Sequence, residues 1–344
     1  MSSSKFSVLG ALQYFLDPSH TKLGIKVRRG CFWSKSDLRV NLTGKVAVVS
    51  GANSGIGKAT ADGLAARGAT VHMLCRSLER GTLARDAIKK NIEKVAREED
   101  GDGGNGGGDA ILHVVDLSEP DQIKKFARDF KAKNERLDIL VNNAAVMPNA
   151  LASNSKGTEV ALATNLAGFY GLTMELSDLL VASEARVVNV VSAGMFAAKL
   201  SIPVVEKGLR ASTLSLENYS GIELYSQHHR ARVMLTDYLA KQWQDKGVTV
   251  NSVHPGWVDT PGLKGAKDME SFTKTMGNLL RTEQEGADTV LWLAMAEKAK
   301  HSTGKYWFDR KSRKKHKLGA GTQSTEEELE QLVDVCKKAF DGMP

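Results

Sequence analysis

Lys45–Gly57 reads KVAVVSGANSGIG, and this stretch decides the fold. Its first half, Lys45–Ser50, is short, apolar and rich in valine, which predicts a parallel strand buried on both faces. Glycines follow at once, and a helical segment is expected from about Ile56 to Arg67. A glycine-rich turn between a strand and a helix lets the backbone approach a pyrophosphate, whose charge is stabilised by the helix N-terminus. The stretch predicts nucleotide contacts from Gly51, Ser54, Gly55, Ile56 and Gly57.

Outward from this stretch, short apolar runs alternate with amphipathic segments. Further strands are expected at Thr70–Cys75, Ile111–Val115, Asp138–Asn142, Arg186–Ser192 and Val248–His254. Helices are expected at about Glu79–Glu98 and Asp121–Lys133. Strands that alternate with helices of 10 to 20 residues are typical of right-handed crossovers in a parallel sheet. The pattern predicts an α/β fold, a Rossmann-like doubly wound parallel sheet in three α/β/α layers.

The chain shows no internal repeat and no clean linker, so we expect a single domain with an N-terminal extension. The extension covers residues 1–42, the dinucleotide-binding domain covers 43–310, and a basic loop and a C-terminal helix of the same domain cover 311–344. Thr282–Met295 begins with a capping box, in which Thr282 is paired with Glu285. Ser324–Phe340 is expected to be an amphipathic helix at the edge of the sheet or at a subunit contact. The glycine-dense segment Gly101–Asp109 is expected to be a loop.

Composition excludes several classes of protein. The chain has 344 residues, of which 42% are hydrophobic and 25% charged, as in ordinary globular proteins. No run approaches the roughly 18 apolar residues that cross a bilayer, so no transmembrane span is expected. The three cysteines are far apart and odd in number, which argues against a disulfide framework or a metal site. We expect an intracellular and cytoplasmic protein, with a mitochondrial location left open.

Two segments leave their roles open. Arg310–Lys317 reads RKSRKKHK and carries much of the net charge of +7. It is either a solvated loop or a contact for phosphate, nucleic acid or anionic lipid. Lys5–Leu16 has apolar residues at near-helical spacing, and no signal-peptide cleavage pattern follows it. It is either a helix docked on the protein's own core, a peripheral membrane anchor or a targeting segment.

The residue after the second strand indicates which nucleotide is bound. Arg76 stands nineteen residues after Gly57, where an acidic residue would bind the ribose 2′-hydroxyl of NAD. An arginine can instead pair with the 2′-phosphate of NADP. Lys58 adds positive charge nearby. The sequence therefore predicts NADP (NADPH) as the cofactor.

Several motifs together resemble the short-chain dehydrogenase/reductase family. They are GANSGIG at Gly51–Gly57, NNAA at Asn142–Ala145, Ser192, Tyr225 and Pro255-Gly256, in the family's order and approximate spacing. The resemblance covers about residues 40 to 310. Three further runs are similar to the subgroup called dehydrogenase/reductase family member twelve, namely His254–Gly262, Glu285–Ala294 and Gly304–Lys311.

The resemblance implies roles for the residues that match those motifs. Asp116 and Leu117 would hold the adenine ring, and Asn143 and Ala144 would line the cofactor ribose. The loop that fixes the nicotinamide carboxamide would be formed by Pro255, Gly256, Val258 and Thr260.

Four residues would make the catalytic centre in this resemblance. Tyr225 would give or take the hydroxyl proton, Ser192 would hydrogen-bond the substrate carbonyl, and Asn165 would anchor a proton-relay water. The family's lysine, four residues after the tyrosine, is replaced here by His229. That lysine bonds the nicotinamide ribose, and its charge lowers the pKa of the tyrosine.

The replacement changes the electrostatics of the predicted site. A unit charge at about 4 Å is worth roughly 4 kcal/mol at an effective dielectric of 20, or about three pKa units. Histidine is mostly neutral at pH 7, so His229 could bond a ribose hydroxyl but could not supply the charge. Arg230 points off the tyrosine's face of the helix, and Arg232 lies on that face but two turns away.

Three functions stay open at this stage. The first is an NADP-dependent reductase acting on a carbonyl/alcohol pair, slow or alkaline-shifted, with His229 as a partial substitute. The second is a catalytically impaired NADP-binding sensor or interaction protein, and the third is a membrane or nucleic-acid partner that uses the basic stretch. A small apolar carbonyl or alcohol is the expected substrate, because Met195, Phe196, Leu200 and Trp257 fall in the expected substrate wall. A homo-oligomer stays open.

Overall fold

The computed structural model describes residues 17–98, 108–215, 217, 219–317 and 322–342. One sheet runs through this part of the chain, in the order β3-β2-β1-β4-β5-β6-β7-β8. Its first six strands are the predicted ones, and their bounds are β1 Val46–Ser50, β2 Thr70–Cys75, β3 Asp109–Val114, β4 Ile139–Asn142, β5 Arg186–Val190 and β6 Thr249–His254. All pairs among them are parallel. The prediction of a doubly wound parallel sheet is confirmed.

Two strands were not predicted. β7 (Tyr306–Phe308) extends the sheet in parallel beside β6, and β8 (Lys311–Arg313) pairs with β7 in antiparallel orientation. Each has three residues, too few to show the alternation or the apolar run by which a strand is recognised. The exposed edge strand β8 carries Lys311, which opposes edge-to-edge pairing with other chains.

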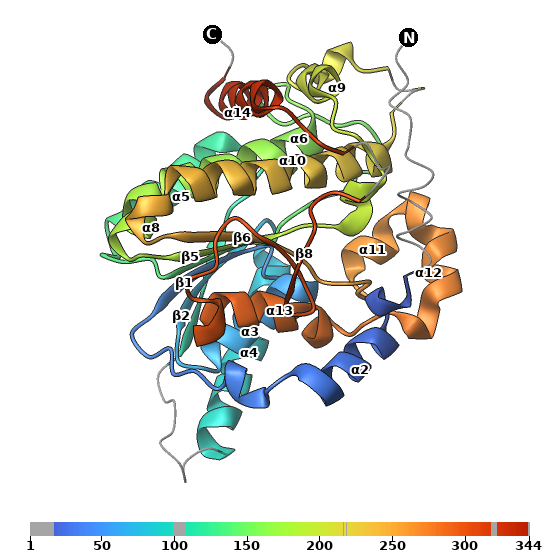
Figure 1. Ribbon diagram of the computed structural model, residues 1–344. Coiled ribbons are helices and arrows are strands. Elements are labelled where there is room, and N and C mark those ends of the chain that lie inside the picture. Colours follow the sequence, from blue (N-terminus) through green and yellow to red (C-terminus); the bar gives the residue numbers. More distant parts are fainter. Residues whose placement is uncertain (1–16, 99–107, 216, 218, 318–321, 343–344) are drawn as a thin grey trace.

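Helices cover both faces of the sheet (Figure 1). One face is covered by α3 (Gly55–Ala65), α4 (Leu78–Glu98) and α13 (Glu283–Met295), whose apolar side chains pack with β1 and β2. The opposite face is covered by α5 (Pro120–Lys131), α7 (Phe169–Glu175) and α10 (Gly221–Gln242). The capping box predicted for α13 is present, with Thr282 and Glu285 paired. The arrangement has the three expected layers.

Shorter elements complete the fold. They are the helices α2 (Lys22–Phe32), α6 (Val160–Leu162), α8 (Ser177–Ala182), α9 (Ile202–Lys207), α11 (Pro261–Gly265) and α12 (Glu270–Met276), and a π-helical segment, Ala163–Gly168. The C-terminal helix α14 (Glu326–Asp341) packs on α10, α9, α7 and the π-helical segment. Of its two predicted places the sheet edge was wrong, because the buried face that includes Leu332, Cys336 and Phe340 joins the core of this helical layer, and a subunit contact stays a prediction.

The order of the strands places the crevice that concerns function. The chain winds outward from β1 to β3, then returns to place β4 on the other side of β1. Loops at the carboxyl ends of β1 and β4 therefore diverge, and ligands bind at such a switch point. Among the described helices, none is both long and apolar enough to cross a membrane. Cys75 and Cys336 are free and buried.

The described part of the N-terminal extension docks on the domain. Arg281 is 1% exposed and donates to the carbonyls of Ser19 and Thr21, at 2.6 and 3.3 Å. The same guanidinium forms a buried ion pair with Asp309, at 2.7 Å. Arg28 on α2 reaches Asp309 as well, at 3.1 Å. The segment Lys5–Leu16, whose role was left open, lies outside the described residues.

The basic stretch is only partly solvated, because Lys311 and Lys314 are exposed and other cations of the stretch have internal partners. The buried Arg310 is bound by Asp288 and stacks over Trp33. Lys315 pairs with Asp237 and donates to the carbonyl of Gly304, at 2.5 and 2.7 Å. The expectation of a loop was wrong for Lys311–Arg313, which form the exposed strand β8, and Arg310 and Lys315 are bound to acidic partners.

Candidate active site

A cavity of about 700 Å³ lies at the carboxyl ends of the central strands. Most of the predicted site residues line it, which brings the glycine turn, the NNAA segment, the tyrosine and the loop after β6 to one place. They are Gly51, Ser54, Gly55, Ile56, Arg76, Asp116, Leu117, Asn143, Ala144, Ser192, Tyr225, His229, Pro255, Gly256, Val258 and Thr260. Gly57 and Asn165 lie behind its wall.

The glycine turn is shaped by close backbone contacts. Gly51 and Gly55 have φ angles of +66° and +60°, which favour glycine. A Cβ on Gly57 would lie 2.3 Å from the carbonyl oxygen of Gly51 and 2.4 Å from Nδ2 of Asn143. Gly57 therefore serves the packing of the turn rather than the lining of the cavity. The turn delivers the N-terminus of α3 to the cavity, and the dipole of a helix favours an anion at its N-terminus.

Asn143 ties this turn to the neighbouring strand. Its Nδ2 donates to the carbonyl of Ser50 at 3.0 Å, and the Ser50 hydroxyl accepts from the amides of Asn143 and Ala144, at 3.0 and 3.1 Å. These bonds hold the loops after β1 and β4 together at the switch point. The predicted ribose-lining pair is thus fixed from behind.

A cationic corner follows β2. The Arg76 side chain is 60% exposed, and its Nε lies 3.9 Å from a carboxylate oxygen of Asp116. Ser77 and Arg80 line the same part of the cavity and were missed by the sequence analysis. The sequence did contain a signal for Arg80, which stands four residues after Arg76, in the first turn of α4. Lys58, which was expected to add charge, does not line the cavity.

Tyr225 and Ser192 stand together at the other end. Ser192 follows β5, and its Oγ accepts from the amide of Gly194 at 3.1 Å. The Tyr225 and Ser192 side chains line the same end of the cavity, close enough for Ser192 to influence the pKa of Tyr225. Burial raises the pKa of Tyr225, while Arg232 and Ser192 act in the opposite direction. The pair can donate two hydrogen bonds to one carbonyl oxygen.

His229 lies one turn after Tyr225 and is buried. The two rings meet edge to face, with centroids 4.1 Å apart and an interplanar angle of 70°. Neither ring nitrogen of His229 has a hydrogen-bond partner among the residues that the structure describes. Burial, with the nearby Arg232, holds the pKa of His229 well below its usual range. The ring is neutral at pH 7 and offers one donor and one acceptor to the cavity.

Asn165 lies in the π-helical segment, a distortion found at many functional sites. Its side-chain oxygen accepts from the amide of Val146 and its nitrogen donates to the Val146 carbonyl, both at 2.8 Å. Its own carbonyl accepts from Nε of Arg232 at 2.7 Å. Asn165 therefore holds the loop after β4, and its role as the anchor of a relay water stays a prediction.

The loop after β6 is fixed from both sides. Arg281 donates from its backbone to the carbonyl of Trp257 at 2.7 Å and from its side chain to that of Pro255 at 3.1 Å. Gly256 has a φ of +88°, and a Cβ there would lie 2.4 Å from Arg281 Nε. The amide of Trp257 donates to the backbone carbonyl of His20 in the N-terminal extension, at 2.9 Å. The extension therefore braces the loop that was predicted to hold the nicotinamide.

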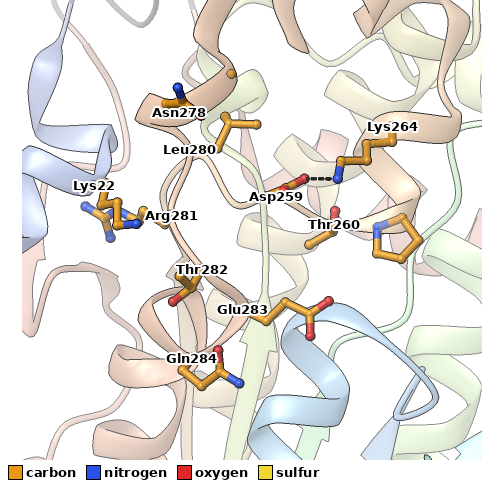
Figure 2. Close-up of a pocket in the computed structure, with 12 residues that line it drawn as sticks. Lys22, Asp259, Thr260, Lys264, Asn278, Leu280, Arg281, Thr282, Glu283 and Gln284 are labelled. Carbon is orange, nitrogen blue, oxygen red and sulfur yellow. Dashed lines mark ion pairs between the residues drawn. The ribbon is translucent and has the colours of Figure 1, made fainter. Parts of the chain in front are cut away.

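A second hollow lies on the outer side of this loop (Figure 2). Its wall includes Arg281 and Glu283, and across it Asp259 pairs with Lys264 at 2.9 Å. Glu283 accepts from the amide of Gly55 at 3.1 Å. These four charged groups are bound to the protein itself. No cluster of three or more metal-binding side chains occurs in the part of the chain that the structure describes.

Comparisons with known proteins agree with this geometry. The sequence model of a family described as enoyl-(acyl carrier protein) reductase matches residues 51–308. The chain is 37% identical over 311 residues to human dehydrogenase/reductase SDR family member 12, with 88% of each chain covered. It is 34% identical to human retinol dehydrogenase 12, over 78% of this chain and 79% of that one.

A solved structure shares the fold. L-sorbose reductase from Gluconobacter frateurii, complexed with NADPH and L-sorbose, superposes with a TM-score of 0.59 at 20% identity, over 78% of this chain and 96% of that one. The family match and the human relatives carry the assignment that the motifs and the sheet had predicted. The chain belongs to the short-chain dehydrogenase/reductase family of oxidoreductases.

Proposed function

We propose that this protein is an NADP(H)-dependent oxidoreductase that interconverts a small apolar carbonyl compound and its alcohol. One observation carries the proposal: Tyr225 and Ser192 together line a cavity whose other end is a glycine turn at a helix N-terminus. A proton donor and an anion site at opposite ends of one cavity are what a nicotinamide dinucleotide and a carbonyl substrate require.

The residues present fit the dinucleotide. The N-terminus of α3 would take the pyrophosphate, and Asn143 and Ala144 would lie beside a ribose. The unpartnered nitrogens of the buried His229 would bond a ribose hydroxyl, which relieves the cost of leaving them unpaired. When bound, the dinucleotide supplies or accepts the hydride of the reaction.

The charge at the cationic corner favours NADP over NAD. Arg76 and Arg80 line the cavity where the chain leaves β2, with the hydroxyl of Ser77 between them. Asp116, the acidic group on that side, lies within reach of Arg76 and accepts from Ser118 at 2.9 Å. Two arginines suit a phosphate dianion better than a ribose hydroxyl.

Tyr225 would transfer the proton in this reaction. In reduction the Tyr225 hydroxyl donates its proton to the carbonyl oxygen, and in oxidation the tyrosinate takes the proton of the alcohol. Ser192 donates a hydrogen bond to the same oxygen and stabilises the charge that develops there. Asn165 and Val146 hold the opposite wall in place through their paired hydrogen bonds.

The substrate side of the cavity is apolar. Its wall includes Met147, Ile222, Trp257 and Phe272, which would receive a hydrophobic body rather than a sugar. The names of relatives such as retinol dehydrogenase 12 support an apolar alcohol. Of the four residues expected in this wall only Trp257 lines the cavity, whereas Met195, Phe196 and Leu200 are buried in the core.

The test follows NADPH consumption with hexanal, benzaldehyde, cyclohexanone and retinal as probes. We expect turnover with at least one, and loss of at least a hundredfold in Tyr225→Phe with NADPH affinity retained. NADPH binding without turnover of any probe would favour the alternative of a cofactor-binding sensor. The replacement of the family's lysine by His229 is the observation that favours this alternative. For the third function, a membrane or nucleic-acid partner, Arg310 and Lys315 are already engaged in internal ion pairs, whereas Lys311 and Lys314 are exposed.

A further inference from the structure

Arg232 is a buried cation whose partners carry no formal charge. It is 1% exposed, and its guanidinium donates to the carbonyls of Asn165, Val190 and Ala144, at 2.7, 3.1 and 2.5 Å. Its fourth contact is the ring of Phe169, 5.1 Å from the guanidinium carbon. No carboxylate of the described residues lies within ion-pair distance of it. Burying a charge without an acidic partner is costly, so a further use for this charge is expected.

The carbonyls that bind Arg232 fix where its charge lies. Ala144 and Val190 line the cavity themselves, after β4 and at the end of β5. Side chains on a helix lean toward its N-terminus, so the long arm of Arg232 reaches from the middle of α10 back toward Tyr225. The guanidinium therefore lies behind the wall of the cavity, at the end where Tyr225 and His229 stand.

We propose that Arg232 supplies the positive charge that favours the tyrosinate form of Tyr225, in place of the lysine that the family carries at position 229. This inference rests on the proposed function. Burial leaves Arg232 a pKa of about 10, so it is charged at neutral pH. Among the contributions to the pKa of Tyr225, the charge of Arg232 opposes the effect of burial. Arg232 acts as a positioning residue, because it touches neither substrate nor cofactor.

The other groups that face Tyr225 do not provide this charge. His229 and His228 on α10, and His254 from β6, are held neutral chiefly by burial, which lowers their pKa values. Ser192 from β5 contributes a hydroxyl. The remaining charged groups that line the cavity are Arg76, Arg80 and Asp116, at the opposite end. No lysine of the described chain lines it.

The test titrates Tyr225 directly, in the protein without cofactor. The absorbance of tyrosinate is recorded against pH for the folded protein, and the curve of Tyr225→Phe is subtracted to isolate one of the six tyrosines. We expect Arg232→Gln to raise the Tyr225 midpoint by about one pH unit or more, as loss of one charge several ångströms away requires. An unchanged midpoint in folded Arg232→Gln would overturn the proposal.

Two variants separate charge from packing. Arg230→Gln is the matched control, since Arg230 is equally buried on the same helix and also donates to a carbonyl, that of Lys315, at 2.6 Å. It should leave the midpoint unchanged. Where Arg232→Gln does not fold, Arg232→Lys carries the test. A retained charge should keep the midpoint within about half a pH unit, and a rise of a full unit there would overturn the proposal.

Rescue gives an independent readout. A lysine introduced by His229→Lys beside Tyr225 should return the midpoint of Arg232→Gln toward that of the unmodified protein. A merely structural loss of the three carbonyl contacts would not be repaired from position 229, and failure of the double variant to recover would contradict the electrostatic role. Where a probe alcohol is oxidised, the rate at pH 7 should fall about tenfold in Arg232→Gln and recover at higher pH. If no probe is turned over, the proposed function fails, and the titration still tests whether Arg232 lowers the pKa of Tyr225.

Discussion

Replacing Arg76 by alanine should weaken the binding of NADPH about tenfold and leave NADH almost unaffected. The reason is that the two reduced dinucleotides differ by one phosphate group, and Arg76 is placed to meet it. Arg76 lines the cavity where the chain leaves β2, and its guanidinium lies on the side of Asp116, which closes β3.

The size of the effect follows from the exposure of the side chain. A hydrogen bond to a charged group is worth about 1.5–3 kcal/mol. The Arg76 side chain is 60% exposed and already has Asp116 at 3.9 Å, so its contribution to binding is expected at the lower end of that range. A loss of about 1.4 kcal/mol is a factor of ten in the dissociation constant. Arg80 would keep part of the affinity, so the double variant Arg76→Ala/Arg80→Ala should lose more than either single one.

Calorimetric titration of each variant with NADPH and with NADH measures the effect. Arg85→Ala is the matched control. Arg85 lies on α4, as Arg80 does, pairs with Asp86 at 2.7 Å and does not line the cavity. Equal losses for both coenzymes in Arg76→Ala, or a loss in Arg85→Ala of the same size, would refute the assignment of the 2′-phosphate to this corner.

Three further predictions concern chemistry and stability. Tyr225→Phe should abolish turnover and keep the NADPH dissociation constant within about threefold; a parallel loss of binding, seen by calorimetry, would show that the ring is needed for the fold of the cavity. Arg281→Met should lower the unfolding free energy by about 2–3 kcal/mol, below the usual cost of breaking a buried pair because Arg28 still faces Asp309; thermal melts that match the unmodified protein would contradict the bracing role. Stability should also fall as the pH drops below about 6.5, because burial lowers the pKa values of several histidines in the folded state, to about 4, 4 and 3 for His20, His72 and His228. The unfolded chain then binds protons that the folded chain does not bind, which lowers the unfolding free energy by up to about 1.4 kcal/mol per pH unit for each histidine. Equal urea midpoints at pH 7.5 and 5.5 would contradict this prediction.

Much of the fold was predictable because its signals are local. Short apolar runs mark the six parallel strands, and the first of them, β1, is rich in valine and ended by glycine. The capping box at Thr282 likewise marked the start of α13 correctly. β7 and β8 were missed because three-residue strands are stabilised by their neighbours in the sheet rather than by their own periodicity.

The candidate site was predictable where the family's motifs contain glycine, tyrosine or arginine at fixed spacing. Sequence reasoning failed where a residue's use depends on partners far along the chain. Arg281 gives no local signal, yet it joins the N-terminal extension to the loop after β6. The basic stretch Arg310–Lys317 looked like a free patch because its acidic partners, Asp288 and Asp237, lie on other helices.

Arg232 shows the limit most clearly. Helical spacing placed it on the face of Tyr225 and two turns away, which made it a distant candidate for the missing charge. Its side-chain direction and its three carbonyl partners were needed to place the guanidinium behind the cavity wall. The replacement by His229 then removes a charge near the tyrosine that Arg232 can supply from the same helix.

The most direct measurement is a calorimetric titration of the purified, folded protein with NADPH. The account predicts one saturable site per chain, with tighter binding than for NADH and a matching rise in the melting temperature. An absence of heat and of thermal stabilisation with reduced and oxidised forms of both coenzymes would contradict a dinucleotide site over the glycine turn, and the roles assigned to Tyr225 and Arg76 would fall with it.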